Sequence, residues 1–271
     1  MLILRHKHTN SMRTPITYYG GKQKMLPHII PLIPEHKLYG EVFAGGLAVY
    51  WAKNPSEIEV INDLNGEVVN FYQVAKNHFE ELQAMVQATL HSRQLHQDAW
   101  LMYCNPHLFA PLKRAWAFWV LCNQSFASSP SSSWGYGKTG NKTELKTHNK
   151  RELFLSDIQK RLEKTQIECH DALHIIRTRD SEDAFFYIDP PYYNADMGHY
   201  GGYKEADFAA LLDTCANIKG KFLLSSYPSD MLAEATSRYG WHTKNVLGVV
   251  TTAKSVRKSK IEVLTANYPI T

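Results

Sequence analysis

Short apolar runs alternate with stretches of helical periodicity along most of the chain. Helical patterns separate most of the runs, and this alternation predicts a doubly wound α/β sheet. The last two runs are joined by a loop, so we expect them to pair as an antiparallel hairpin at one edge, because parallel neighbours need a long crossover. The seven runs with the length and composition of strands are 38–44, 58–62, 166–169, 184–188, 221–225, 241–249 and 261–267.

One interval breaks this alternation. From about residue 70 to residue 162 the apolar positions follow helical spacing, as in Leu82, Met85 and Val86. A segment rich in serine and glycine, 128–138, interrupts the helices and carries two aromatic residues. We therefore expect a sheet domain formed by 1–69 and 163–271, with an inserted, mainly helical domain at 70–162.

Composition and charge allow many partners. The chain has 271 residues, 44% of them hydrophobic, which suffices for a packed core, and its formal net charge is +4. Basic residues gather in two stretches, 138–151 and 254–260. Solvated loops show the same pattern, so neither stretch by itself indicates nucleic acid.

Cysteine usage and hydropathy narrow the class of protein. The four cysteines are widely separated and form no C-x-x-C pair, which argues against a zinc site or a redox motif. No run approaches the roughly twenty apolar residues of a membrane span, and the first residues are too few and too basic for a signal peptide. We expect a cytoplasmic protein with reduced cysteines, no metal and no membrane segment.

The run 185–192 carries the most specific chemistry. Phe185 to Ile188 reads as a buried strand, and it ends at Asp189 because Pro190 and Pro191 cannot continue a sheet. Ligands of open α/β sheets bind outside the carboxyl ends of the strands. A carboxylate, the Pro190 carbonyl and the face of Tyr192 could together hold a flat ring that bears an exocyclic amine. A solvated aspartate at a strand-to-loop break is the alternative interpretation.

Two glycine turns precede helical patterns. Gly20 and Gly21 stand between Tyr18 and Lys22, and a cation beside a helix start would suit a carboxylate, although an ordinary turn with an exposed lysine has the same sequence. The second turn follows the strand that begins at Leu38. It does not spell G-x-G-x-x-G, so the dinucleotide fingerprint is absent.

Acids end two further strands. Asp63 follows the second strand at the position where a carboxylate accepts ribose hydroxyls, and Asp171 follows the third, where it could accept a hydrogen bond from an adenine amine. Each could instead cap the next helix. Taken with the glycine turns and Asp189, they indicate a site for a nucleoside without a diphosphate.

The order of these motifs resembles that of the Dam-type, D12 class of S-adenosylmethionine-dependent DNA adenine-N6 methyltransferases, and the likeness spans nearly the whole chain, including 254–268. It implies a Rossmann-like methyltransferase with a seven-stranded mixed sheet, encoded by a bacterium or phage, in which the insertion is a target-recognition domain. S-adenosylmethionine is then the cofactor. By the resemblance its contacts are Tyr18 and Lys22 beside the methionine part, Phe43 to Gly45 beneath it, Asp63 at the ribose and Asp171 at the adenine.

The resemblance also implies a mechanism. Asp189 and the Pro190 carbonyl accept the amine hydrogens of a flipped adenine, Tyr192 stacks on the base, and the methyl group moves by direct in-line displacement without a covalent intermediate or a metal. Double-stranded DNA is the expected partner. Lys138, Arg257 and Lys258 are the expected DNA contacts.

The chain departs from the family pattern at several positions. Leu47 replaces a common small residue, and Ala172 stands where phenylalanine is frequent. The pattern of GATC-specific relatives is not found, and its nearest counterpart is 123–127, so the sequence favours another target. Cytosine-N4 transfer, an RNA substrate, a catalytically silent nucleic-acid binder and a nicotinamide oxidoreductase remain as alternatives.

Overall fold

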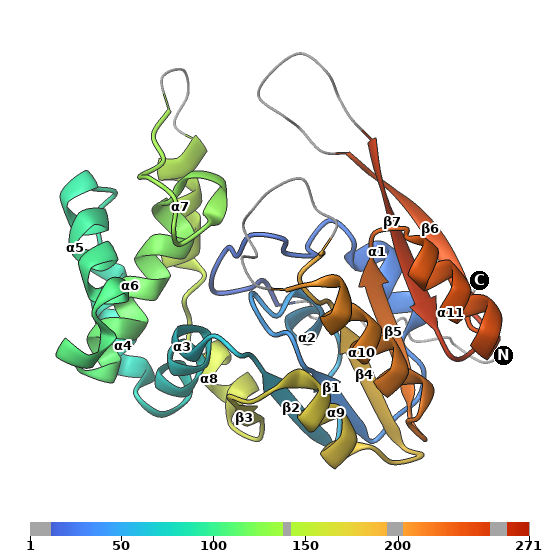
Figure 1. Cartoon of the computed structure of the whole chain (residues 1–271). Coiled ribbons are helices and arrows are strands. Elements are labelled where there is room, and N and C mark those ends of the chain that lie inside the picture. The colour runs from blue at the N-terminus through green and yellow to red at the C-terminus, as the bar shows by residue number, and fades with distance from the viewer. Residues whose placement is uncertain (1–11, 138–141, 194–202, 250–258, 271) are drawn as a thin grey trace, which may run out of the picture.

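The computed structural model describes residues 12–137, 142–193, 203–249 and 259–270. Within these residues seven strands form one sheet in the order β3-β2-β1-β4-β5-β7-β6 (Figure 1). The predicted seven-stranded mixed sheet is confirmed. The strands are β1 Leu38–Glu41, β2 Ile58–Asn62, β3 Gln166–Glu168, β4 Ala184–Ile188, β5 Lys221–Ser226, β6 His242–Val249 and β7 Ser259–Ala266.

Strand direction divides the sheet in two. The five strands from β3 to β5 are parallel, whereas β7 runs antiparallel to both β5 and β6. The hairpin expected from the last two runs is therefore present, with β6 at the edge. The first strand ends three residues earlier than its apolar run, because the chain turns at Gly45 to begin the next helix.

Helices cover both faces of the sheet, which gives three layers. One face carries α9 to α11, and the other carries α1 to α3. Side-chain polarity sets several helix starts, since Asn65, Ser92 and Ser229 each accept a backbone N–H of the first turn. The helices are α1 Leu26–Ile29, α2 Ala48–Ala52, α3 Gly66–Asn77, α4 Phe79–Gln87, α5 Arg93–Cys104, α6 Pro111–Gln124, α7 Lys142–Glu152, α8 Asp157–Leu162, α9 Ala172–Arg179, α10 Glu205–Ala216 and α11 Asp230–Tyr239.

The alternation of side chains along β4 explains the two cores. Phe185 and Tyr187 point to the layer of α1 to α3, while Phe186 and Ile188 point to the layer of α9 to α11, and all four are buried. A strand buried on both faces must be apolar throughout. That requirement is why the run could be recognised in the sequence.

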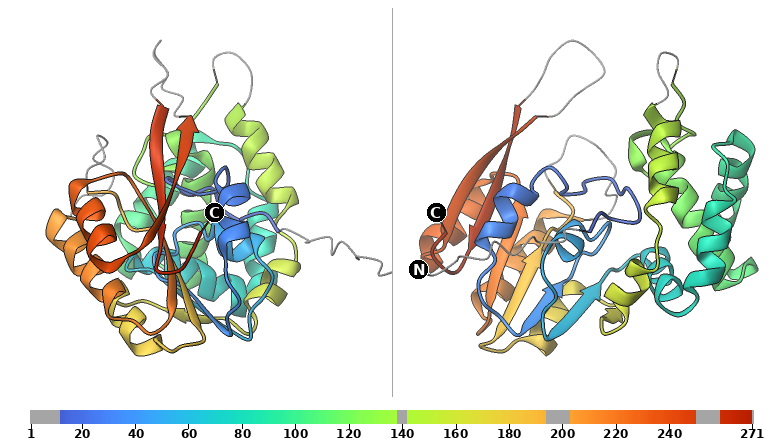
Figure 2. Two further views of the ribbon diagram at one scale, coloured as in Figure 1. Left: turned by 90° about the vertical axis from the view of Figure 1, so that its right-hand side faces the viewer. Right: turned by 180° about the vertical axis from the view of Figure 1, so that it is seen from behind.

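The helices α4 to α7 stand to one side of the sheet, opposite the β6–β7 edge, and Figure 2 shows the same separation from behind. They are joined to the sheet through a continuous apolar core, in which Phe118 of α6 packs against Phe71 of α3. The helix α3 itself runs across residue 70. The inserted helices are therefore anchored on α3, in the layer formed by α1 to α3.

Helices α6 and α7 also hold the N-terminal segment that leads into the first glycine turn. The indole N–H of Trp119 donates to the Pro15 carbonyl at 3.2 Å, and the Thr17 amide donates to Oδ1 of Asn123 at 3.1 Å. The ammonium of Lys150 donates to the carbonyl and hydroxyl oxygens of Thr14. The insertion thus positions the chain immediately before Tyr18.

Candidate active site

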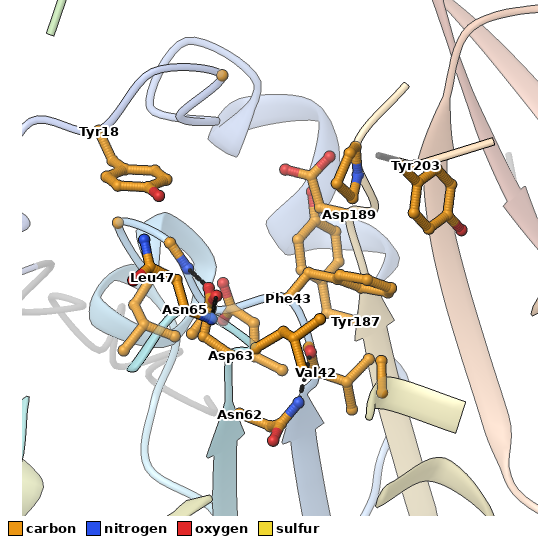
Figure 3. A pocket seen from close by; sticks show the side chains of 18 of the residues that line it. Tyr18, Val42, Phe43, Leu47, Asn62, Asp63, Asn65, Tyr187, Asp189 and Tyr203 are labelled. Atoms are coloured by element: carbon orange, nitrogen blue, oxygen red, sulfur yellow. Dashed lines mark hydrogen bonds between the residues drawn. The ribbon is translucent and has the colours of Figure 1, made fainter. Parts of the chain in front are cut away.

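A cavity of about 660 Å³ opens at the carboxyl ends of β1, β2 and β4, and Figure 3 shows its lining. This volume lies in the range of small-molecule sites. The predicted cofactor residues meet here, although they come from five separate stretches of the chain. Those that line it are Tyr18, Lys22, Phe43, Gly45, Asp63, Asp171 and Asp189.

The second glycine turn is shaped by the ring of Tyr18. A Cβ added at Gly45 would lie 2.9 Å from that ring, and one added at Gly46 would lie 3.1 Å from the Tyr18 side chain. Gly45 also has φ +44°, a left-handed conformation that favours glycine. The two turns are therefore packed directly on one another, and burial raises the pKa of Tyr18.

Leu47 adopts a left-handed conformation at the start of α2, with φ +54° and ψ +41°. A non-glycine residue here costs about 1–2 kcal/mol. Its side chain is buried in the core, which offsets that cost. The departure from the family pattern at Leu47 is thus accommodated by packing, and the turn is kept.

The carboxylate of Asp63, which follows β2, binds two segments of backbone: the glycine turn after β1 and the start of α3. Its Oδ2 accepts the Gly45 amide and its Oδ1 accepts the Asn65 amide, both at 2.8 Å. Burial raises the pKa of Asp63, and the two amides oppose that rise. Each carboxylate oxygen has a second lone pair, so the group still has acceptor capacity toward the cavity.

Asn62, which sequence reasoning passed over, ties three strand ends together. Its Nδ2 donates to the carbonyls of Val42 and His170, and its Oδ1 accepts the His170 amide, all within 3.0 Å. The side chain is fully buried. Since its three partners follow β1 and β3, Asn62 fixes the spacing of the strand ends that form the cavity (Figure 3).

Asp171 and Phe43 also line the cavity. Asp171 is exposed and caps α9, since its Oδ1 accepts the His174 amide at 3.0 Å. The Phe43 ring meets the ring of Tyr203 edge-on, with centroids 6.3 Å apart. The capping alternative considered for Asp171 is therefore real, and the same side chain also lines the cavity.

Asp189 follows β4 as predicted and is paired with Lys22. The ammonium lies 2.8 Å from Oδ1 of Asp189 and 3.2 Å from Oε1 of Glu262. Burial raises the pKa of Asp189 to about 6, although the ammonium opposes that rise. For Lys22 burial acts in the opposite direction and lowers the pKa, but its two carboxylate partners hold that pKa above the ordinary value. Lys22 is thus a buried cation rather than an exposed turn residue.

The hydroxyl of Tyr192 joins the same group. It lies 3.2 Å from Oδ1 of Asp189 and donates to Oε1 of Glu262 at 2.7 Å, and it is 3.2 Å from the Ser225 hydroxyl. Its ring lies 4.4 Å from that of Tyr227 and faces the Lys22 ammonium at 5.0 Å. The tyrosine is therefore held at both its ring and its hydroxyl.

Three acids of the site were not predicted: Asp207 on α10, which lines the cavity, and two acids on strands, Glu262 and Glu41. Glu262 on β7 shares its face of the strand with Leu264 and Ala266, which are both buried in the core. Glu41 ends β1, accepts the Tyr39 hydroxyl at 2.6 Å and the Tyr50 amide at 3.0 Å, and lines the cavity. An acid on the apolar face of a strand pattern is the signal that would have identified both.

Burial has different consequences for these two acids. It raises the pKa of Glu41 to about 8, against the Tyr39 hydroxyl and the Tyr50 amide, which lower it. Burial acts in the same direction on Glu262, but the Lys22 ammonium and the neighbouring hydroxyls lower its pKa below the usual range. At neutral pH Glu262 is therefore charged, whereas Glu41 is largely protonated.

The residues of the insertion occupy two settings. In the nearest counterpart of the GATC-reading pattern, 123–127, Asn123, Gln124 and Ser125 are buried, whereas Phe126 is 64% exposed. Trp134 stacks on His91 with ring centroids 4.7 Å apart, and the guanidinium of Arg93 lies 4.7 Å from the Trp134 ring. His91 and Arg93 thus both contact the Trp134 ring in the insertion. The predicted DNA contacts Lys138, Arg257 and Lys258 lie outside the described residues.

In the described ranges no three side chains of histidine, cysteine, aspartate or glutamate gather as metal ligands would. Nor does any helix of those ranges have the length and hydrophobicity that crossing a membrane requires. All four cysteines are unpaired.

The strand order, the antiparallel β7 and the pocket at the carboxyl ends define a Rossmann-like methyltransferase fold. Comparison with protein families identifies it more closely. Residues 18–248 match the model of the D12 class N6 adenine-specific DNA methyltransferases. The chain belongs to this family, which confirms the resemblance inferred from the order of motifs.

Individual relatives are more distant. The chain is 22% identical to the type II methyltransferase M.FokI of Planomicrobium okeanokoites over 97% of its own length and 44% of that protein. It is 34% identical to the type II methyltransferase M1.LlaDCHI of Lactococcus lactis subsp. cremoris over 36% of its length and 34% of that protein. It is 27% identical to a DNA N-6-adenine-methyltransferase of Escherichia phage P1 over 66% of its length and 24% of that protein. The chain thus spans less than half the length of these relatives.

Proposed function

We propose that the protein transfers a methyl group from S-adenosylmethionine to the N6 amine of adenine in double-stranded DNA. The observation that carries this proposal is the position of Asp189. Its carboxylate lies at the wall of the acidic cavity, and its Oδ1 lies 3.2 Å from the Tyr192 hydroxyl. An acceptor for an amine therefore borders a site that suits the methyl donor, and the Pro190 carbonyl and the Tyr192 face would complete the base site.

The cavity suits S-adenosylmethionine by its charge and by its backbone. Among the described residues the lining holds the acids Asp63, Asp171, Asp189 and Asp207 and the largely protonated Glu41, against one lysine and no arginine. The lysine is already paired with two carboxylates. This lining favours a cationic ligand and is unsuited to a diphosphate. The absence of side chains at Gly45 and Gly46 lets Tyr18 pack against the second glycine turn, where all three residues line the cavity.

We assign the ends of the cofactor from the positions of the acceptors. Asp63 accepts the ribose hydroxyls, and Asp171 accepts the adenine amine, while Phe43 to Gly45 lie beneath the nucleoside. Tyr18 and Lys22 border the methionine part. We add Glu41 to these predicted residues, because its carboxylate is suited to accept hydrogen bonds from the ammonium of the methionine part.

Bound S-adenosylmethionine supplies a methyl group on a sulfonium. Asp189 and the Pro190 carbonyl accept the two N6 hydrogens of the adenine, so that the nitrogen lone pair turns toward the methyl carbon. The sulfonium of bound S-adenosylmethionine would keep the electron pair of its S–C bond as the methyl group is transferred to the nitrogen held by Asp189. The surplus proton of N6 is released through Asp189, which is mostly ionised at pH 7 because its pKa is about 6.

We assign DNA binding to the insertion and to the loop between β6 and β7. The insertion at 70–162 would be the target-recognition domain, with 1–69 and 163–271 as the catalytic domain. In both figures of the whole chain, the inserted helices and the β6–β7 hairpin extend to the same side of the sheet, with the segment around Tyr18 between them. Lys138, Arg257 and Lys258 would contact phosphates, whose contacts position a duplex. The bacterial and phage origin of the relatives supports a bacterial or phage-encoded protein that acts in the cytoplasm.

The reaction is tested by incubating DNA of mixed sequence with the protein and deuteromethyl-labelled S-adenosylmethionine, followed by mass spectrometry of the nucleosides. We expect labelled N6-methyladenine. Labelled N4-methylcytosine would instead support cytosine transfer. Cofactor binding without any labelled nucleoside would support a silent DNA-binding protein.

A further inference from the structure

Glu262 contacts the Lys22 ammonium and the Tyr192 hydroxyl, which are also the groups that contact the proposed catalytic carboxylate of Asp189. Its Oε1 accepts the Ser225 hydroxyl at 2.6 Å and the Tyr192 hydroxyl at 2.7 Å, and lies 3.2 Å from the Lys22 ammonium. One oxygen thus receives three donors from three different parts of the chain. The side chain is only 15% exposed.

The arrangement is a carboxylate–ammonium–carboxylate triad. Lys22 lies between Asp189 and Glu262 and cannot pair fully with either, because it is shared. Two carboxylates near one cation repel each other, and that repulsion raises the proton affinity of the one that is held less well. Tyr192 bonds to both acids, so it links their positions as well.

We propose that Glu262 is the positioning residue of the methyl-transfer site: by sharing Lys22 with Asp189 and anchoring the Tyr192 hydroxyl, it sets both the place and the proton affinity of the Asp189 carboxylate. This inference rests on the proposed function. Glu262 is not among the residues that line the cavity. It acts through Asp189, which must accept a hydrogen from the amine more strongly than a fully paired aspartate does.

The charged and titratable surroundings support this role. The pKa of Asp189 is raised first by burial and then, against the effect of Lys22, by the charge of Glu262. Other groups near the pair are Tyr187 on β4 and Glu41 on β1, and both are also buried. On β6 the residue opposite Glu262 is Val246, which carries no charge, and Lys244 lies opposite Leu264.

The charge of Glu262 affects the pKa of Asp189 in a definite direction. Removing the charge of Glu262 leaves Lys22 to Asp189 alone, which stabilises the ionised form of Asp189. The pKa of Asp189 then falls. Glu262→Gln keeps an acceptor oxygen for the hydroxyls of Tyr192 and Ser225 but removes the charge, so it separates charge from packing.

Two measurements test this proposal. Carbon-13 NMR of carboxyl-labelled aspartate, with Asp189→Asn to assign the signal, should show that Asp189 titrates about one pH unit lower in Glu262→Gln than in the wild type. In single-turnover methylation, the acid limb of the pH–rate profile should move down by the same amount, and the rate at pH 8 should fall about three- to tenfold. Glu168→Gln, which removes a charge paired with Arg179 on β3, is the matched control.

If Glu262→Gln does not fold, Glu262→Asp replaces it. That variant keeps the charge but withdraws it by one methylene from Lys22, so the Asp189 titration should again move down. A purely structural role would lower stability and rate while leaving the titration and the acid limb unchanged, and this result would overturn the proposal. The NMR titration needs no turnover, so it separates failure of this proposal from failure of the proposed activity.

Discussion

The Lys22 ammonium lies 2.8 Å from Oδ1 of Asp189, although 167 positions separate the two residues. The glycine turn that lines the proposed cofactor site therefore carries the counter-ion of the proposed catalytic carboxylate. A shift of this turn when a ligand binds would change the surroundings of Asp189 directly. The two halves of the site are thus electrostatically linked.

Asp63→Ala should weaken S-adenosylmethionine binding by about ten- to a hundredfold, because the loss removes acceptors for the ribose and for the Gly45 amide. Isothermal titration calorimetry measures the dissociation constant. Asp180→Ala is a matched control, since Asp180 also accepts two backbone amides, from Lys219 and Gly220, but does not line the cavity. An unchanged constant in Asp63→Ala, or an equal loss in the control, would contradict the assignment.

Glu41 should make cofactor binding release protons. Burial raises its pKa to about 8, so it is mostly protonated at pH 7, and binding of an ammonium favours the ionised form. Binding should therefore release a fraction of a proton, and affinity should rise between pH 6 and pH 7.5. Calorimetry in buffers of different ionisation enthalpy measures that release. The proposed contact is wrong if Glu41→Gln releases as many protons as the wild type and binds equally tightly.

The Glu41 carboxyl group should also make the stability of the ligand-free protein depend on pH. The folded pKa of Glu41 is raised above its unfolded value, so its protonation contributes stability at low pH, and that contribution is lost as pH rises toward 8. The free energy of unfolding should fall by up to about 1.4 kcal/mol per pH unit from this residue. Urea unfolding of the wild type and Glu41→Gln between pH 5 and pH 8 tests this, and parallel curves would contradict it.

Lys150→Met should loosen the segment before the first glycine turn. The substitution leaves the buried oxygens of Thr14 without their donor, which costs about 1–3 kcal/mol. We expect a lower melting temperature and weaker cofactor binding, because Tyr18 follows this segment. Lys160→Met, on the exposed surface of α8, is the control. Equal melting temperatures of the two variants would show that Lys150 does not hold the segment.

Arg257 and Lys258 should contact DNA phosphates. Replacing both with alanine should reduce the salt dependence of DNA binding by up to about one unit of slope for each charge. Fluorescence anisotropy at several salt concentrations measures this slope. The exposed pair Lys160 and Arg177 serves as the control. A slope equal to that of the wild type would exclude both residues from phosphate contact.

The strands and their terminal acids could be predicted because both depend on local pattern. Asp63 and Asp189 follow runs that are apolar for a reason of packing, and the carboxyl ends of parallel strands meet at one edge. The second partner of Lys22, Glu262, could not be predicted in the same way. Glu262 reaches the site only because β7 inserts beside β5 in the sheet.

Side chains that hold backbone also escaped prediction. Asn62 and Asn123 each bond to segments far away in the sequence, and such bonds leave no periodic signal. Leu47 departs from the family pattern, and burial of its side chain offsets the cost of its left-handed backbone.

The most direct test of the proposed activity is to express the protein in a host that lacks DNA methylases and to map modified bases by single-molecule sequencing. For the wild type we predict N6-methyladenine at one short recurring sequence. Asp189→Asn, which removes the charge of the proposed catalytic acceptor, should lose at least about a hundredfold in transfer rate and leave the DNA essentially unmodified. Unmodified DNA from a folded, cofactor-binding wild type, or an equal pattern from Asp189→Asn, would contradict the account.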